Sequence, residues 1–393
     1  MVIHVFLNDK LISADIIVPL LYEIKEYRGN DKNTKIRFYF SSYKDNGLES
    51  LMRNIVLFDS MCNLGEYIVY GRKNFSRFSK LLHRIWLIKF MLMNSISIIF
   101  RDSYIFHFGA IDKYPLRFFY LINKKKSYFF SQWPFAYPEN LFTVNNHYKK
   151  RKLNNNSVSA SKYITYKNDK NPDLYRFKDI KNIHLDCNPH RGISWLKYLE
   201  NNGQKWVNLY NLNFKPNQYI TYALRHFNSE AALVNPKTDL ADLLHDTLEI
   251  IDNTLSNKTI LLKPHGFTDI SHLKEVVKKF SKNKYIIVEL HPLILSYISK
   301  VFISNFFSIL YNDAHIFNTP VIEYTRYSDE TLSLINNGPI YPEYVTHFIN
   351  NDSDYFSKTL KTISDEKYTE NKFVSKESCD AINISSIFSK DKG

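Results

Sequence analysis

Three short apolar segments between residues 258 and 325 each end in a polar cluster, and no other feature of the chain constrains its fold as strongly. The clusters are Lys263-Pro264-His265-Gly266, Glu289-Leu290-His291-Pro292 and Ser304-Asn305-Phe306-Phe307-Ser308. Helix-like stretches separate the segments, which predicts βαβ units and a parallel sheet. Ligands of such sheets bind at the carboxyl ends of the strands. Basic, imidazole and hydroxyl groups at those ends can all donate to an anion, so the pattern indicates a phosphate site.

The N-terminal half repeats this alternation, and the whole pattern predicts an α/β fold of two Rossmann-like domains facing a ligand cleft. Strands are predicted at 2–7, 35–40, 103–108, 126–130, 218–224, 259–262, 285–289, 300–303 and 320–324. Helices are predicted at 14–27, 74–93, 238–255, 271–280 and through most of the tail from 342, whereas 149–172 is predicted to be an exposed loop. The expected domains are 1–210 and 218–340, followed by a helical tail, 341–393.

Composition narrows the possible functions. The chain has 10 Gly among 393 residues and contains neither a GxGxxG motif nor a P-loop, which disfavours a Rossmann dinucleotide enzyme and a P-loop NTPase. The net charge of +13 favours an anionic partner. No standard nucleic-acid-binding motif is present, so a phosphorylated substrate or a membrane surface is the expected partner.

Cysteine content and the N-terminal sequence predict a cytoplasmic protein. Three cysteines are too few for a disulfide framework. The N-terminus has a strand pattern and lacks the layout of a signal peptide. The most apolar segment, 85–100, is interrupted by Lys89 and Asn94 and is shorter than the ~20 residues that a spanning helix needs.

The C-terminal half supplies the candidate donor-binding residues. Lys263 and His265 would contact a phosphate beside Gly266, although a plain strand-end turn explains them as well. His291 is either a second site element or part of a turn. Ser304 could cap a helix or contact the phosphate, and a cap and a ligand contact can share one helix end. Further donor-binding candidates are Asn305, Ser308, Glu323 (through ribose hydroxyls, unless it is a solvated strand end) and Arg225 (as an anion clamp).

The catalytic carboxylate is less well defined by the sequence. Glu230 follows Arg225 and could act as base or nucleophile, and Asp112 is a candidate general base in the N-terminal half. The acceptor-side candidates are Asn8, Asp9 and His107, which follow or end predicted strands.

Two further patterns concern metals and membranes. His184, Cys187 and His190 have metal-like spacing but lack a fourth ligand, so no metal is predicted. On the helix predicted from 73 to 93, Lys73, Arg77, Lys80 and Arg84 share one face, and the apolar residues lie largely elsewhere. Such a helix either packs on the sheet or rests on an anionic membrane.

Three motifs carry a resemblance to a known group. LLKPHG (261–266), ELHP (289–292) and ISNFFSILYNDAHIFNTPVIEY (303–324) resemble bacterial glycosyltransferases of the two-domain GT-B kind that build O-antigen and capsule. The chain looks most like the CMP-sugar branch, the sialyl-, polysialyl- and Kdo-transferases. That resemblance implies that His265 or His291 is the group's histidine and Ser304 or Ser308 its hydroxyl. The acidic motif of the polysialyl branch is absent, so the resemblance assigns no catalytic carboxylate.

The expected function is therefore transfer of a sugar, from CMP-sialic acid or CMP-Kdo, to a lipid-linked glycan in surface polysaccharide synthesis. A transferase that uses a UDP- or TDP-sugar or an activated polyol phosphate, and a non-catalytic subunit of an assembly complex, remain as alternatives. The C-terminal domain would bind the nucleotide sugar and the N-terminal domain the acceptor. No cofactor, metal or nucleic acid is expected, and the protein is expected to be peripheral at the inner face of the cytoplasmic membrane.

Overall fold

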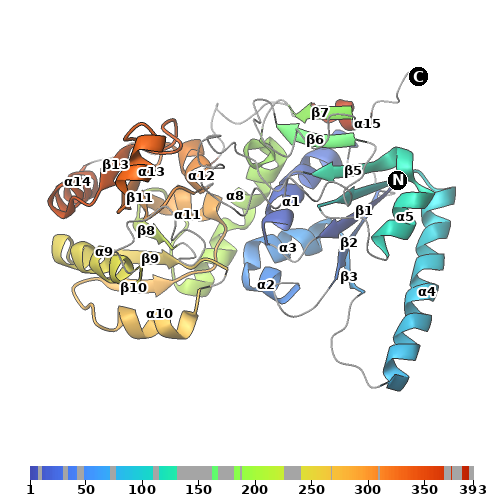
Figure 1. Ribbon diagram of the computed structural model, residues 1–393, viewed down its shortest axis with the longest axis horizontal. Helices are drawn as coiled ribbons and strands as arrows, with labels where there is room; N and C mark the ends of the chain where they lie inside the picture. Colours follow the sequence, from blue (N-terminus) through green and yellow to red (C-terminus); the bar gives the residue numbers. More distant parts are fainter. Residues whose placement is uncertain are drawn as a thin grey trace. The chain divides into compact units, whose positions relative to one another are not determined.

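The structure is a computed structural model of the chain. It describes residues 1–7, 11–29, 34–41, 48–70, 77–108, 115–130, 162–166, 181–185, 188–224, 240–266, 268–308, 310–366, 373 and 383–388. The chain divides into two compact units, each built on its own parallel sheet (Figure 1). The two sheets with their helices confirm the predicted class of two Rossmann-like α/β domains.

Unit 1 contains a seven-stranded sheet in the order β3-β2-β1-β4-β5-β6-β7, with parallel pairing throughout. Its strands are β1 (Val2–Leu7), β2 (Lys35–Phe40), β3 (Glu66–Val69), β4 (Ser103–His107), β5 (Ser127–Phe130), β6 (Lys162–Tyr166) and β7 (Lys181–Leu185). The central strands β1 and β4 are buried along their whole length, as expected for inner strands of a parallel sheet that is covered on both faces.

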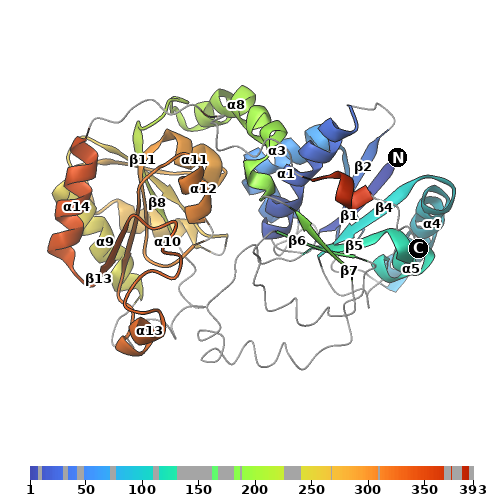
Figure 2. The ribbon, with the colours of Figure 1, turned by 90° about the horizontal axis from the view of Figure 1, so that it is seen from above.

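Helices cover both faces of this sheet (Figure 2). One face carries α1 (Leu11–Tyr27), α2 (Leu48–Arg53) and α3 (Ile55–Leu64), and the other carries α4 (Arg77–Phe100) and α5 (Leu116–Ile122). Under α4 and α5, a cluster that includes Phe6, Tyr39, Phe90 and Phe119 forms the core. The 15-residue helix α8 (Ile193–Val207) follows the last strand.

Unit 2 contains a six-stranded sheet in the order β10-β9-β8-β11-β12-β13, again all parallel. Its strands are β8 (Tyr219–Ala223), β9 (Thr259–Lys263), β10 (Lys284–Ile287), β11 (Ser299–Ser304), β12 (Val321–Thr325) and β13 (His347–Asn350). Its helices are α9 (Leu240–Thr254), α10 (Ile270–Val277), α11 (Pro292–Ile298), α12 (Leu310–Ile316), α13 (Asp329–Leu334) and α14 (Ser353–Asp365).

The division of the chain differs from the expected boundaries 1–210, 218–340 and 341–393. The units divide between residues 196 and 197, inside α8, because the start of this helix packs on unit 1 and its remainder on unit 2. The predicted tail is also shared. Strand β13 pairs with β12 of unit 2 and α14 packs on α9, whereas α15 (Ser385–Phe388) packs beside β7 of unit 1.

Two local expectations were wrong. The stretch 149–172 is not loop throughout, because it contains β6, where Tyr163 and Ile164 are buried between two neighbouring strands. The basic helix is longer at its C-terminal end than expected, and its outward face carries apolar side chains: Leu82, Ile85 and Trp86 are exposed alongside Arg84.

Candidate functional site

Both sheets reverse their strand order at one point. In unit 2 the chain moves outward from β8 to β9 and β10 and then returns to place β11 on the other side of β8. Unit 1 does the same around β1 and β4. In open parallel sheets this reversal opens a crevice at the carboxyl ends of the two strands, where ligands bind. The topology therefore places one candidate site beyond β8 and β11, and another beyond β1 and β4.

The predicted donor residues of unit 2 lie in one row at this edge. Strand pairing aligns Lys263 of β9 with Ala223 of β8, Ala223 with Ser304 of β11, and Ser304 with Glu323 of β12. With neighbouring strands about 4.8 Å apart, the row spans roughly 14 Å. Three residues that the sequence singled out on separate strands are thus brought together across the reversal point.

The end of β9 offers partly exposed groups. Lys263 and His265 are half-buried and Gly266 is exposed. The Lys263 carbonyl accepts a hydrogen bond from Leu224 N at 2.9 Å, which ties this strand end to the end of β8. The His265 carbonyl accepts from Thr268 N at 2.9 Å, so the backbone turns tightly here. Lys263 and His265 therefore lie at the surface of the carboxyl edge on a turn with fixed ends.

The segment after β11 is held by internal bonds. Ser304 is buried, and its Oγ donates to the Phe306 carbonyl at 3.0 Å. Phe307 N donates to Tyr327 Oη at 3.1 Å. Ser308 Oγ accepts from Leu310 N at 3.3 Å at the start of α12. Ser304 thus does not cap the following helix as the sequence suggested; Ser308 takes that position. Whether either residue also contacts a phosphate stays a prediction.

Glu323 and Tyr327 form a buried polar pair behind this segment. Tyr327 Oη donates to Glu323 Oε1 at 2.8 Å, and both side chains are buried. Burial, and after it the nearby carboxyl of Glu323, raises the pKa of the Tyr327 phenol well above its usual range, so the hydroxyl keeps its proton. This geometry gives Glu323 a role in supporting the backbone of Phe307, and its proposed contact with ribose remains a prediction.

His291 forms a helix cap. It is fully buried, and its Nδ1 accepts from Leu293 N at 3.1 Å at the first turn of α11, where Pro292 supplies the fixed φ of a helix start. Glu289, two residues earlier, is half-buried, and its backbone N donates to Tyr210 Oη at 3.1 Å. The turn interpretation of the His-Pro pair accounts for both residues without a ligand.

The acceptor-side candidates are only partly described. His107 ends β4 at the reversal point of unit 1, fully buried, with its ring 5.5 Å from that of Phe129. Asn8 and Asp9 follow β1, and Asp112 follows β4, but these three lie outside the described residues. In unit 2, Arg225 and Glu230, which follow β8, lie outside them as well. The proposed catalytic roles of Asp112 and Glu230 stay predictions.

A histidine–aspartate pair in unit 1 was missed by the sequence reasoning. Asp15 lies near the start of α1, and His190 lies in a short 3-10 helix after β7. The His190 Nε2 donates to the Asp15 carbonyl at 2.8 Å and lies 3.8 Å from Asp15 Oδ1. Both follow carboxyl ends of strands. No local sequence pattern indicates this pair, because 175 positions separate the partners.

Among the described residues of unit 2, one group of side chains has ligand atoms close enough for a metal. His245, Asp246 and Glu249 on α9 bring their atoms within 4.8 Å of one another. Arg326 already pairs with Asp246 at 2.7 Å, and His245 lies 3.9 Å from Glu249. Ion pairing explains this group, and the absence of a metal from the proposed chemistry remains a prediction.

Comparisons with known proteins give a likeness in layout. No family model matches the sequence, and no curated protein matches it. Over 93% of the chain, it aligns with 91% of the glycotransferase of kitacinnamycin (8% identity, TM-score 0.46). It aligns similarly with 91% of MurG from Acinetobacter baumannii (10% identity, TM-score 0.40) and 88% of MnaA from S. aureus, solved with UDP (11% identity, TM-score 0.48). These values decide no function, and the fold class rests on the two sheets themselves.

Proposed function

We propose that this chain is a glycosyltransferase whose unit 2 binds a nucleotide-activated sugar at the carboxyl edge of its sheet. The observation that carries the proposal is the position of the candidate residues. Lys263, Ser304 and Glu323, which lie on three separate strands, fall in one row across the reversal point. In the sequence, Asn8 and Asp9 follow β1, His107 ends β4 and Asp112 follows β4, the two reversal strands of unit 1. A two-substrate transferase needs one site of each kind.

Lys263 and His265 are the groups proposed to meet the donor phosphates. Transfer of a sugar leaves negative charge on the departing phosphate, and a fixed cation and hydrogen-bond donors lower the energy of that charge. Both residues are partly exposed at the end of β9, and the tight turn after them restricts their movement. The loop after β11, held by Tyr327, would form the neighbouring wall.

For the donor we propose a UDP-sugar in place of the expected CMP-sugar. The expectation of CMP rested on a His-Pro motif and a later hydroxyl. His291 is spent as the buried cap of α11, and Ser304 donates to a backbone carbonyl. Two of the four residues that singled out CMP, including the histidine of the His-Pro pair itself, are therefore explained without it. UDP enters as the nucleotide present in the structure of S. aureus MnaA.

The acceptor is proposed to be a glycan of a surface polysaccharide, bound by unit 1. Asp112 is proposed as the general base, with Glu230 as the alternative carboxylate. Both assignments rest on the sequence positions of these residues after β4 and β8.

A nucleotide-protection experiment tests the proposal. The melting temperature of the full chain is measured with about 1 mM UDP, CMP, GDP or TDP, because a ligand at 100 times its Kd adds about 2.7 kcal/mol of stability. UDP is expected to raise it most. His265→Ala should reduce the melting-temperature shift caused by UDP and raise the apparent Kd for UDP at least tenfold. His272→Ala, which replaces an exposed histidine on α10, should leave both unchanged.

Each other outcome has a defined meaning. Protection by CMP alone would support the CMP-sugar donor expected from the sequence and would overturn the proposed UDP-sugar donor. Protection by none of the four nucleotides would overturn the transferase and favour a non-catalytic subunit. Equal UDP affinity in the wild type and the His265→Ala variant would overturn the assignment of the site.

A further inference from the structure

The helix α4 turns an apolar face to the outside of unit 1. Phe100 is 81% exposed, and the exposed fractions of other large apolar side chains on the same helix lie between 40% and 62%. Prominent among them are Ile85, Ile88, Leu92, Met93, Ile96 and Ile99. Contiguous apolar exposure of this extent marks a surface that meets another apolar phase.

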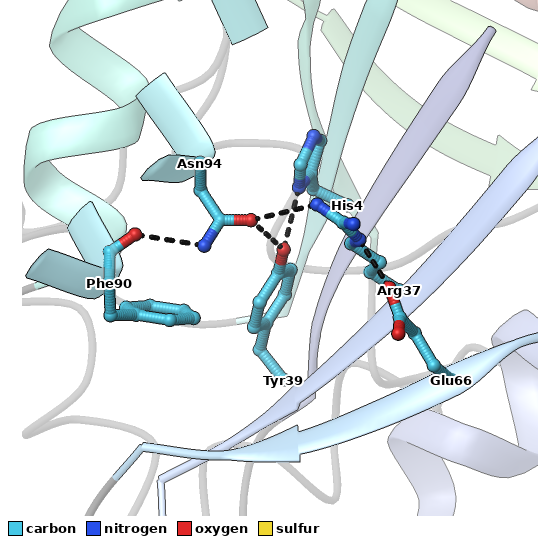
Figure 3. A network of polar contacts seen from close by, with 6 residues as sticks. All are labelled: His4, Arg37, Tyr39, Glu66, Phe90 and Asn94. Carbon is cyan, nitrogen blue, oxygen red and sulfur yellow. Dashed lines mark hydrogen bonds and ion pairs between the residues drawn. The ribbon is translucent and has the colours of Figure 1, made fainter. Parts of the chain in front are cut away.

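The opposite face of α4 is bonded firmly to the sheet. Asn94 is buried, and its Oδ1 accepts from Tyr39 Oη at 2.9 Å and from Arg37 Nη1 at 3.1 Å (Figure 3). Phe90 and Ile98 join the core cluster below the helix. By length and composition alone the segment Leu82–Phe100 could cross a membrane. Crossing would expose Asn94 to lipid and break these bonds, so the fold favours a helix that keeps its place and presents one face.

The charges around the outward face are mainly positive, and the exposed Asp102 at its end is paired with Lys126 at 2.5 Å. The sequence of α4 contains no Asp or Glu, and Arg84 and Lys89 are exposed among its apolar side chains. Arg101 follows the helix directly and is exposed, as are Lys124 and Lys125 after α5, which packs against α4. The apolar face is thus interrupted and bordered by cations.

A groove runs between α4 and the strands β2 and β3. Its volume is about 440 Å³, and its lining includes Arg37, Glu66, Trp86, Lys89, Met93 and Arg101. Glu66 pairs with Arg37 at 2.5 Å and offsets its charge. The surplus positive charge of the groove therefore comes from Lys89 and Arg101, next to apolar walls. An anionic head attached to an apolar tail matches that combination.

We propose that α4 lies in the interfacial layer of an anionic lipid bilayer, with the groove taking a lipid phosphate. A second copy of the chain is a poorer occupant, because a two-fold interface on this face would enclose Lys89 and Arg84 of both copies, and α4 supplies no acidic partner for them. It would also bury Lys89 in a dry contact, whereas at a bilayer a lysine extends its ammonium to the headgroups. The inference is independent of the proposed transferase activity.

Vesicle flotation of the full chain tests this proposal. Phosphatidylcholine vesicles are compared with vesicles that contain about 30% phosphatidylglycerol, at about 0.1 M and 0.5 M salt, since salt screens surface attraction. We expect at least tenfold more protein on the anionic vesicles and a marked loss at high salt. The double variant Leu92→Glu/Ile96→Glu should lose at least tenfold in binding, whereas Leu209→Glu, an exposed leucine of unit 2, should bind like the wild type.

Further measurements separate the alternative occupants. Unchanged melting temperatures would show that the variants fold. Quenching of tryptophan fluorescence by spin-labelled lipid should fall in Trp86→Phe, with Trp133, which lies outside the described residues, replaced by Phe in both proteins. Trp86 is exposed, whereas Trp195 and Trp206 are fully buried. Equal flotation of the wild type and the double variant would overturn the proposal. The proposal would also be overturned if the wild type bound no vesicles and formed a dimer in lipid-free solution, while the double variant was monomeric. Resistance to alkaline carbonate extraction would indicate a spanning helix instead.

Discussion

Tyr222 of β8 donates a hydrogen bond to Oδ1 of Asn305, the residue that follows β11, and so links the two strands at the reversal point of unit 2. The Nδ2 of the same amide donates to Thr247 Oγ1 on α9 and to the carbonyl of Tyr324 on β12, each at 2.9 Å. The buried Asn305 amide thus links the end of β11 to the strands β8 and β12 and to the helix α9. The backbone that follows Asn305 leaves the sheet in a direction fixed by this amide.

Tyr222→Phe should therefore destabilise the protein and weaken nucleotide binding together. The variant leaves a buried amide oxygen without its donor, which costs about 1–3 kcal/mol. We expect urea unfolding to show that loss, and the apparent Kd for UDP to rise because the segment after β11 is less firmly held.

Tyr285→Phe is the matched control for this prediction. The Tyr285 hydroxyl donates to Asp252 Oδ1 at 3.1 Å near the start of β10, at the opposite end of the sheet. This variant should lose stability without a change in the Kd for UDP. A parallel rise of Kd in both variants would mean that general destabilisation, rather than the reversal-point link, controls binding.

Much of the fold could be predicted because the central strands are buried on both faces. Strands β1, β4, β8 and β11 are rich in apolar and aromatic residues, and the predicted bounds agree with them within a residue or two. Strand β3 is four residues long with an exposed start, and β6 lies within a basic, polar region. Such strands are stabilised mainly by pairing with a neighbouring strand, and the local sequence does not show which strand that is.

The candidate site was predictable in position but not in detail. A polar residue at a strand end can face a ligand or bond within the protein, and the sequence looks the same in both cases. Lys263 and His265 reach the surface, whereas Ser304 and His291 bond to their own backbone. Their partners, Phe306 and Leu293, are only two positions away, but the turn that brings each pair together is visible only in the fold.

Gly203→Ala should destabilise the protein although it improves helix propensity. Gly203 lies inside α8, where replacing Gly by Ala ordinarily stabilises by about 1 kcal/mol. A Cβ atom at this position would lie 2.3 Å from the ring of Phe214, which itself packs against Tyr297 and Phe373. Displacing that ring should cost about 1–3 kcal/mol. A rise in the melting temperature of the variant would contradict the packing described for Phe214.

His4 should make stability fall with acid. The Tyr39 hydroxyl spends its proton on Asn94, so the Nδ1 of His4 must donate to Tyr39 Oη, at 2.9 Å, and the ring is neutral. Burial, and after it the nearby Arg37, lowers the pKa of His4 to about 3 from 6.5. Between about pH 3 and pH 6.5, His4 is therefore protonated in the unfolded chain but stays neutral in the folded chain. The free energy of unfolding should therefore drop by up to about 1.4 kcal/mol per pH unit below 6.5.

His4→Asn isolates this effect, since the amide can still donate to Tyr39 Oη but does not titrate. Urea unfolding of both proteins between pH 7.5 and pH 5 should show the wild type losing about 2 kcal/mol more than the variant. The gap should open only below about pH 6.5, the ordinary pKa of histidine. Parallel stability curves would mean that His4 binds its proton in the folded protein.

Asn94→Ala should test how firmly α4 is held to the sheet. The variant removes the acceptor of Tyr39 Oη and of Arg37 Nη1, and also the bond from Asn94 Nδ2 to the Phe90 carbonyl at 2.9 Å. Buried Tyr39 would then lack its acceptor, and we expect a loss of about 2–4 kcal/mol in urea unfolding.

Asn202→Ala supplies the matched control for Asn94→Ala. Asn202 on α8 makes the same bond to the carbonyl four residues earlier, from Nδ2 to Tyr198 at 2.9 Å, and its exposure is greater. Its loss should cost less than about 1 kcal/mol, because the freed carbonyl can reach water. The difference between the two variants measures the contribution of the bonds from Asn94 to the sheet. A difference near zero would mean that the apolar core alone, through Phe90 and Ile98, keeps α4 in place.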